Sequence, residues 1–559
     1  MTNKQSQTKP LQSSKQTNGK DLHTAQTGAQ VLVEHIAARG VKHLYGVPGG
    51  DCSLDIIEAA EKMGISFILT RTENAAAMMA CSEAELTGTL GAVLTTRGPG
   101  VANAANGVAY ASLDRVPMVF ISDGYDNNQA SVSHQRFDQT AMLSPVIKGA
   151  LRLDDVTALP AIDGLLDLAM SGRPGPVYIE VTAQCMRNTI LSGCLPVRIA
   201  PSTFGPPTVD ALKLAHGLVL GSQRPILVVG LQCRDKNVTK ALRAFAHKLQ
   251  CPVFSTYKAK GVMPEADPQL SGYFINGAAE EETFRCADLI IMFGADPVEF
   301  PPTAFKYGST KVLEFTNAQF DRCVYQPALS VAGDLALAAM HMCECARPSS
   351  WHAEELRKIK THMLTRATAN EGGPITPQLL VETSCNLMPA DTRCTVDAGV
   401  HMLSVIAHLQ AKDPYDLLIS RGLATMGIAL PAAIGMAMAD PQRHVVAFTG
   451  DGGLMMCTAE LATAVELGCN ITVVVFNDSA ITMIGLKQKS RQFDRVGMDY
   501  GHTDFAMVGQ GFGCQSFRVT TPAELEAALR NAFACEGPTL VDAVLDPTAY
   551  RHQMLSLRG

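Results

Sequence analysis

The stretch His444-Val-Val-Ala-Phe-Thr-Gly450-Asp451-Gly452-Gly453 joins a run of apolar residues directly to a glycine-rich turn that carries one carboxylate. We expect a buried strand over 444–448, a helix over about 458–467, and a second strand that ends at Phe476-Asn477-Asp478. Asp451 and Asp478 then follow the carboxyl ends of two strands, which is where open α/β sheets bind their ligands.

The composition of this turn favours a phosphate and a divalent cation. Gly450, Gly452 and Gly453 lack side chains, so backbone N–H groups can approach a phosphate at the start of the helix. Asp451 and Asp478 add two hard oxygen ligands, which suit Mg²⁺ beside phosphate oxygens. For the Gly-Asp-Gly triplet alone, a tight turn with two capping carboxylates is the alternative.

The same alternation of short apolar strands and amphipathic stretches fills most of the 559 residues. It predicts an α/β fold of three sequential doubly wound parallel-sheet domains, over 21–188, 206–345 and 374–550. Residues 1–20 consist mostly of Gln, Ser, Thr, Asn and Lys and are expected to form a disordered tail.

The amino-acid composition limits the kinds of molecule that this protein is expected to bind. Only 18% of residues are charged and 47% are hydrophobic, which predicts large buried surfaces, including a subunit interface. The net charge of −7 provides no basic surface for nucleic acid or an anionic membrane, and no apolar run is long enough to span a bilayer. Sixteen cysteines without CxxC pairs, and no secretory leader, favour a reduced, cytoplasmic protein that acts on small molecules.

The spacing of the two carboxylates resembles a family signature. Twenty-five residues separate Gly452 from Asp478, similar to the Gly-Asp-Gly … Asn-Asn pattern of thiamine diphosphate enzymes. Asn477-Asp478 departs from Asn-Asn and resembles the catabolic branch of the acetolactate synthase-like group. The resemblance implies that Asp451, Asp478 and the backbone carbonyl of Ala480 bind Mg²⁺.

Further motifs of the third domain resemble the same family. The block that begins at Gly422 and contains Met426-Gly427 resembles its Gly-Thr-Met-Gly segment, in which the Met bends the cofactor, although Met426 alone could be core filler. Gly399 and His401 match a Gly-Gln-His segment that holds the diphosphate, with Val400 in place of Gln. The cofactor-binding residues that the resemblance implies are Glu73, Gly399, His401, Met426, Gly450, Asp451, Gly452, Gly453, Met456, Asp478 and Met483.

The first domain carries the implied catalytic residues. Glu73 opens an Ala-rich helix, where a carboxylate usually compensates the helix dipole. The resemblance makes Glu73 the partner of the aminopyrimidine ring of the cofactor. Gly50 and Asp51 lie in a segment that resembles the Gly-x-Pro-Gly-Gly loop of the family, which implies that they face the reactive carbon, with Asp51 a candidate substrate contact. Gln135 resembles a catalytic Gln that reaches the site from the same subunit as Glu73.

The resemblance implies that the acceptor pocket lies along a helix after Asp478. Met483, Ile484 and Lys487 fall on one helical face, and Lys487 could pair with the carboxylate of a keto acid. With Lys489 and Arg491 close by, Lys487 could equally belong to a solvated cationic stretch.

The resemblance implies an activity and a quaternary structure. The expected reaction is decarboxylation of a 2-keto acid, pyruvate by default, with carboligation to a second carbonyl. The alternatives are a 2-keto acid decarboxylase, an acyloin lyase, an oxalyl-CoA decarboxylase, or a non-catalytic binding homologue. A homodimer or homotetramer is implied, with active sites at the subunit interface. A flavin-dependent member of the family is a further alternative, because the central domain has a flavin-like location. The segment 228–234 of this domain carries no flavin signature, so FAD is expected to be absent.

Overall fold

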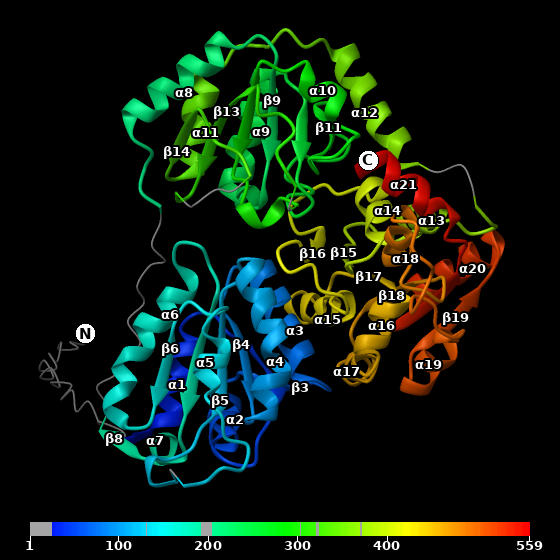
Figure 1. Ribbon diagram of the computed structural model, residues 1–559. Helices are drawn as coiled ribbons and strands as arrows, with labels where there is room; N and C mark the ends of the chain where they lie inside the picture. Colours follow the sequence, from blue (N-terminus) through cyan, green and yellow to red (C-terminus); the bar gives the residue numbers. More distant parts are fainter. Residues whose placement is uncertain are drawn as a thin grey trace, which may run out of the picture.

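The computed structural model describes residues 25–129, 131–191, 204–301, 303–319, 324–368 and 372–558. Within them lie three six-stranded parallel sheets, one after another along the chain, with helices packed against each (Figure 1). This confirms the predicted three α/β domains with parallel sheets. The predicted tail at 1–20 lies outside the described residues.

The first sheet has the strand order β3-β2-β4-β5-β7-β6. An antiparallel pair, β1 with β8, joins the start and the end of this domain through Ala25 and Leu191. The strands are β1 (Ala25–Thr27), β2 (His43–Val47), β3 (Ser66–Leu69), β4 (Gly91–Thr95), β5 (Met118–Asp123), β6 (Ala150–Leu153), β7 (Pro176–Val181) and β8 (Thr189–Leu191). The α-helices are α1 (Gly28–Ala37), α2 (Cys52–Lys62), α3 (Glu73–Thr87), α4 (Pro99–Leu113), α5 (Gln139–Leu143), α6 (Ile162–Met170) and α7 (Ala183–Arg187).

The central sheet has the order β11-β10-β9-β12-β13-β14. Its strands are β9 (Pro225–Val229), β10 (Val253–Ser255), β11 (Leu270–Tyr273), β12 (Leu289–Phe293), β13 (Lys311–Thr316) and β14 (Leu329–Ala332). Its α-helices are α8 (Val209–Gly221), α9 (Lys236–Leu249), α10 (Glu281–Arg285) and α11 (Leu335–Cys345). α12 (Ala353–Ala367) falls between the predicted second and third domains and packs on β11.

The third sheet has the order β16-β15-β17-β18-β20-β19. Its strands are β15 (Arg393–Val396), β16 (Leu417–Ile419), β17 (Val445–Gly450), β18 (Ile471–Asn477), β19 (Gln515–Val519) and β20 (Thr539–Val544). Its α-helices are α13 (Pro377–Leu387), α14 (His401–His408), α15 (Ala429–Ala439), α16 (Asp451–Cys457), α17 (Glu460–Glu466), α18 (Thr482–Ser490), α19 (Phe505–Phe512), α20 (Pro522–Ala534) and α21 (Thr548–Arg558). The central strands β17 and β18 are buried almost throughout, as expected for parallel strands covered on both faces.

The predicted helix over about 458–467 is present as α17, and one helix that was not predicted precedes it. This helix, α16, begins at Asp451 itself. The sequence did not predict a helix start at Asp451, because Gly452 and Gly453 have a low helix propensity. Asp451 therefore lies at the N-terminus of a helix as well as at the end of a strand.

Contacts between domains fix the third domain against the other two. α15 packs on α3 of the first domain, and α21 packs on α12 and α14. Lys258 of the central domain forms buried ion pairs with Glu85 (3.0 Å) and Asp114 (2.9 Å) of the first domain. Asp114 also accepts a hydrogen bond from the Ser420 hydroxyl of the third domain (2.9 Å). One carboxylate thus connects all three domains just before the Met426 loop.

No helix in the described ranges is long and apolar enough to cross a membrane.

Candidate active site

Asp451 and Asp478 emerge side by side from neighbouring strands. β17 and β18 are paired in parallel register with Gly450 opposite Phe476, so both chains leave the sheet at the same edge. The backbone N–H of Asp478 donates to the Asp451 carboxylate (3.1 Å), and the Tyr500 hydroxyl donates to its other oxygen (2.8 Å). The structure therefore brings together the two carboxylates that the sequence predicts as metal ligands.

The electrostatics of this pair suit a divalent cation. Burial raises the pKa of Asp478 to about 7, and the neighbouring charge of Asp451 contributes to this rise. Burial also raises the pKa of Asp451. Two partly buried carboxylates that disfavour each other's ionisation are stabilised by a bound cation.

The protein supplies only part of a coordination shell here. Ala480 lines the same cavity as Asp451 and Asp478. No group of three or more His, Cys, Asp or Glu side chains able to hold a metal occurs among the described residues. Mg²⁺ typically takes one or two carboxylates and completes its shell with water and phosphate oxygens. The donor set therefore fits Mg²⁺ held jointly with a diphosphate.

His401 offers a free hydrogen-bonding atom to such a diphosphate. Its ring stacks on Phe476 with centroids 5.1 Å apart, and burial lowers its pKa to about 3, so the imidazole is neutral. Its Nε2 atom is buried and has no hydrogen-bond partner in the described part of the chain. A Cβ at Gly399 would lie 2.5 Å from this ring, so a larger residue would displace it.

Asp397, which has no role in the predictions above, shapes the Met426 loop. Its fully buried carboxylate accepts hydrogen bonds from the backbone N–H groups of Gly427 (3.1 Å), Ile428 (2.6 Å) and Ala429 (3.0 Å). A Cβ at Gly453 would meet the same carboxylate at 1.9 Å. Asp397 therefore ties the Met426 loop to the glycine turn. The sequence feature that could have identified Asp397 is its position as an acidic residue directly after strand β15.

A cavity of about 310 Å³ opens beside these residues. The predicted residues that line it are Gly399, His401, Met426, Gly450, Asp451, Gly452, Gly453, Asp478, Ala480, Met483 and Ile484. Lys487 lies farther along α18, is exposed and does not line it, and neither does Met456, which is 61% exposed. Tyr500, Tyr550, Arg421 and Arg558 line the cavity although the sequence analysis assigned them no role.

The first domain holds the other predicted residues. Glu73 begins α3, and its carboxylate accepts a hydrogen bond from the Asn103 side chain (3.2 Å). Gly50 and Asp51 follow β2, where the Asp51 carboxylate forms an ion pair with Arg97 (2.9 Å). Gln135 has a left-handed backbone (φ 56°) and lines a second cavity, together with Arg97.

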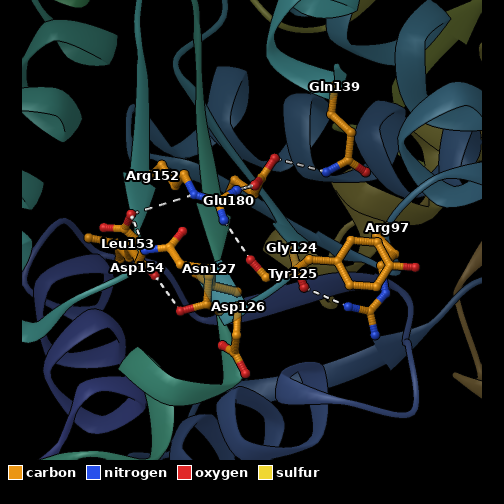
Figure 2. Close-up of polar contacts among 12 residues, drawn as sticks. Arg97, Gly124, Tyr125, Asp126, Asn127, Gln139, Arg152, Leu153, Asp154 and Glu180 are labelled. Atoms are coloured by element: carbon orange, nitrogen blue, oxygen red, sulfur yellow. Dashed lines mark hydrogen bonds and ion pairs between the residues drawn. The ribbon is translucent and has the colours of Figure 1, made fainter. Parts of the chain in front are cut away.

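A polar framework supports the loop that carries Gln135. Figure 2 shows Arg97 donating to the carbonyl of Gly124 (2.5 Å) and Arg152 donating to the carbonyl of Tyr125 (2.5 Å). The Gln139 side chain donates a hydrogen bond to the Glu180 carboxylate (3.0 Å). These contacts fix both ends of the loop against β5 and β7.

The two sets of predicted residues do not meet within one chain. None of Gly50, Asp51, Glu73 and Gln135 is among the described residues that line the third-domain cavity. The predicted residues of a single chain therefore fall into two separate groups, one on the first domain and one on the third, which we call the two predicted half-sites.

Comparisons with known proteins agree with this division. Family models of thiamine pyrophosphate enzymes match residues 26–142 (N-terminal TPP binding domain), 212–342 (central domain) and 397–543 (C-terminal TPP binding domain). Acetolactate synthase of Bacillus subtilis is 28% identical over 534 residues, covering 93% of each chain. The catabolic acetolactate synthase of Raoultella terrigena is 28% identical over 534 residues, covering 93% of this chain and 95% of that protein. The chain belongs to the family of thiamine pyrophosphate enzymes and carries its N-terminal, central and C-terminal domains in that order.

Proposed function

We propose that this enzyme uses thiamine diphosphate and Mg²⁺ to decarboxylate pyruvate and to join the remaining two-carbon unit to a second 2-keto acid, as an acetolactate synthase does. The observation that carries the proposal is the cavity in which Asp451, Asp478 and the free Nε2 atom of His401 lie together. The similarity to acetolactate synthases extends along nearly their whole length, which supports the same reaction class.

Different residues of the third domain would bind the metal ion and the diphosphate of the cofactor. Asp451, Asp478 and the carbonyl of Ala480 would hold Mg²⁺, and His401 with the backbone of the glycine turn would hold the diphosphate. Met426 lies against this turn, since a Cβ at Gly452 would be 3.4 Å from its methyl carbon. When bound, thiamine diphosphate supplies a nucleophilic carbon and accepts the electrons that decarboxylation releases.

The active site is proposed to form between two copies of the chain. The third-domain cavity contains no described residue of the first domain, which supports a site to which a partner subunit would contribute Glu73 and Gln135. Large apolar side chains are exposed on α16 and on the segment after α18: Met455, Met456, Phe493 and Val496. Exposed apolar side chains that gather beside an incomplete site are typical of a protein interface. We therefore assign a homodimer, or a tetramer of two such dimers.

The central domain does not fit a flavin nucleotide. In parallel sheets the backbone N–H groups after the strands receive the phosphates of a dinucleotide. Here the buried Glu299 carboxylate already accepts from the N–H groups of Leu231 and Asp296, both at 3.0 Å, and from the Thr256 hydroxyl at 2.5 Å. An internal carboxylate thus already accepts from these N–H groups, and we propose that FAD has no part in the reaction.

The proposal also places the protein in the cytoplasm. All cysteines in the described ranges are free rather than paired in disulfides. Unpaired cysteines, most of them buried, are typical of a reducing compartment.

Product analysis tests the reaction directly. The protein is incubated with thiamine diphosphate, Mg²⁺ and pyruvate, and the products are identified by mass spectrometry, with Asp451→Ala as the inactive control. Acetolactate is the expected product. Acetaldehyde alone would indicate a decarboxylase, acetoin formed from added acetaldehyde would indicate an acyloin lyase, and turnover of oxalyl-CoA would indicate its decarboxylase. Cofactor binding without turnover of any 2-keto acid would indicate a binding homologue.

A further inference from the structure

Two arginines line the cavity that contains the proposed metal ligands. Arg421 lies two residues after β16, in the loop that leads to Met426, and Arg558 is the last residue of α21. The two residues are far apart in the sequence, and α21 brings the second one to the cavity. Sequence patterns gave no reason to connect them.

No carboxylate within the described ranges forms an ion pair with either guanidinium. The Nε atom of Arg421 donates to the backbone carbonyl of Glu299 (3.1 Å), and its guanidinium lies 5.4 Å from the centre of the Tyr257 ring. The Arg558 side chain hydrogen-bonds the side chain of the same Tyr257. Burial lowers the pKa of Arg421 and the charge of Arg558 also lowers it, while Tyr257, Glu299 and Asp114 act in the opposite direction. Two like charges therefore share a partly desolvated wall of the cavity.

The nearest carboxylates have other partners. Asp114 accepts from Lys258 (2.9 Å), from the Ser420 hydroxyl (2.9 Å) and from the backbone N–H of Arg421 (2.8 Å). Glu299 faces the backbone N–H groups of the central sheet. The arginine side chains thus retain free N–H donors toward the cavity, and an anionic ligand would relieve their repulsion.

The arginines reach the cavity from a different side than the diphosphate-binding residues. Their contacts, Tyr257 and the carbonyl of Glu299, belong to the central domain. Asp451 and His401 belong to the edge of the third sheet. This separation favours an anion of the substrate over the diphosphate of the cofactor.

We propose that Arg421 and Arg558 form a subsite that binds the carboxylate of the acceptor 2-keto acid. This inference rests on the proposed function. The carboxylate of the donor leaves as CO₂ and loses its charge, so a strong cationic partner would stabilise the ground state and slow the reaction. The carboxylate of the acceptor keeps its charge in the product. A pair of arginines can therefore hold it throughout, with the paired N–H geometry that arginine offers a carboxylate.

The first experiment compares acceptors that differ in charge. Arg421→Met, Arg558→Met and the double variant are assayed with pyruvate as donor and either 2-ketobutyrate or propanal as acceptor. We expect the KM for 2-ketobutyrate to rise at least tenfold in each variant and the KM for propanal to change less than twofold. Arg421→Lys should recover part of the loss, because it restores the charge without the paired donors. Arg530→Met, an exposed arginine on α20, is the matched control.

A second measurement does not depend on turnover. Calorimetry of the holoenzyme with oxamate, a carboxylate that cannot be decarboxylated as a keto acid, should show binding that weakens at least tenfold in Arg421→Met, while thiamine diphosphate affinity stays the same. Equal effects on both acceptors, or a parallel loss of thiamine diphosphate affinity, would overturn the subsite. Normal oxamate binding through the arginines in an enzyme that makes no acetolactate would refute the proposed reaction and leave the subsite intact.

Discussion

Glu460 of the third domain accepts hydrogen bonds from the backbone N–H of Thr72 (3.0 Å) and from its hydroxyl (3.3 Å) in the first domain. It also accepts from the backbone N–H of Arg71 (3.1 Å). The fully buried Glu460 side chain thus fixes the two residues that precede Glu73. The helix that follows Asp451 in one half-site is tied to the start of the helix that carries Glu73 in the other.

Glu460→Ala is expected to misplace Glu73 and lower kcat about tenfold, with little change in thiamine diphosphate affinity. The substitution leaves two backbone N–H groups without their acceptor, at a cost of about 1–3 kcal/mol in the free energy of unfolding. Steady-state kinetics and denaturant unfolding measure the two effects. Glu466→Ala, an exposed residue of the same helix that pairs with the Arg71 side chain, is the control and should leave kcat unchanged.

Glu73→Gln should bind the cofactor but activate it poorly. The carboxylate is one contact among many, yet it is the group expected to control the protonation of the aminopyrimidine ring. Exchange of the thiazolium ring proton, followed by NMR after acid quench, should slow by orders of magnitude. Exchange at the wild-type rate would exclude this role.

Asp451→Ala should abolish retention of thiamine diphosphate, because the proposed Mg²⁺ would lose one of its two carboxylate ligands. Asp478→Asn should retain measurable binding, since an amide oxygen can replace a carboxylate oxygen as a hard ligand. Calorimetric titration with thiamine diphosphate, with and without Mg²⁺, distinguishes the two variants. Unchanged affinity in Asp451→Ala would contradict the metal assignment.

Asp397→Ala should release the Met426 loop and lower cofactor affinity without removing any proposed ligand. Three backbone N–H groups would lose their acceptor inside the protein. We expect a loss of about 3 kcal/mol in the free energy of unfolding. Thiamine diphosphate added in excess should raise the melting temperature of the wild type more than that of the variant. Identical shifts in both proteins would show that the loop does not depend on Asp397.

Glu299 should make the stability depend on pH. Burial raises its pKa to about 7 in the folded protein, against 4.5 for the ordinary side chain. The folded state therefore binds the extra proton, and the contribution of Glu299 to stability is present below pH 4.5 and is lost as the pH rises toward 7. The difference in unfolding free energy between wild type and Glu299→Gln should change by roughly 3 kcal/mol over this interval. A difference that is independent of pH would contradict the raised pKa.

The sequence alone determined the class of fold and the position of the two proposed metal ligands. Buried strands in a parallel sheet are continuous apolar runs, and the ligand-binding residues follow directly after them, so local patterns placed Asp451, Asp478 and the glycine turn correctly at one edge of a sheet. The start of α16 was not predicted, because Gly452 and Gly453 have a low helix propensity.

The tertiary structure alone decided which distant residues share the site. Arg421 and Arg558 lie more than a hundred residues apart, and their common cavity depends on how α21 packs against α12 and α14. The contact of Glu460 with Thr72 and the contact of Glu299 with Leu231 also depend on the tertiary structure. Each of these contacts results from packing between elements that no local periodicity relates. The separation of Glu73 from the third-domain cavity is likewise a property of the folded chain, and it is the reason for assigning the complete site to two subunits.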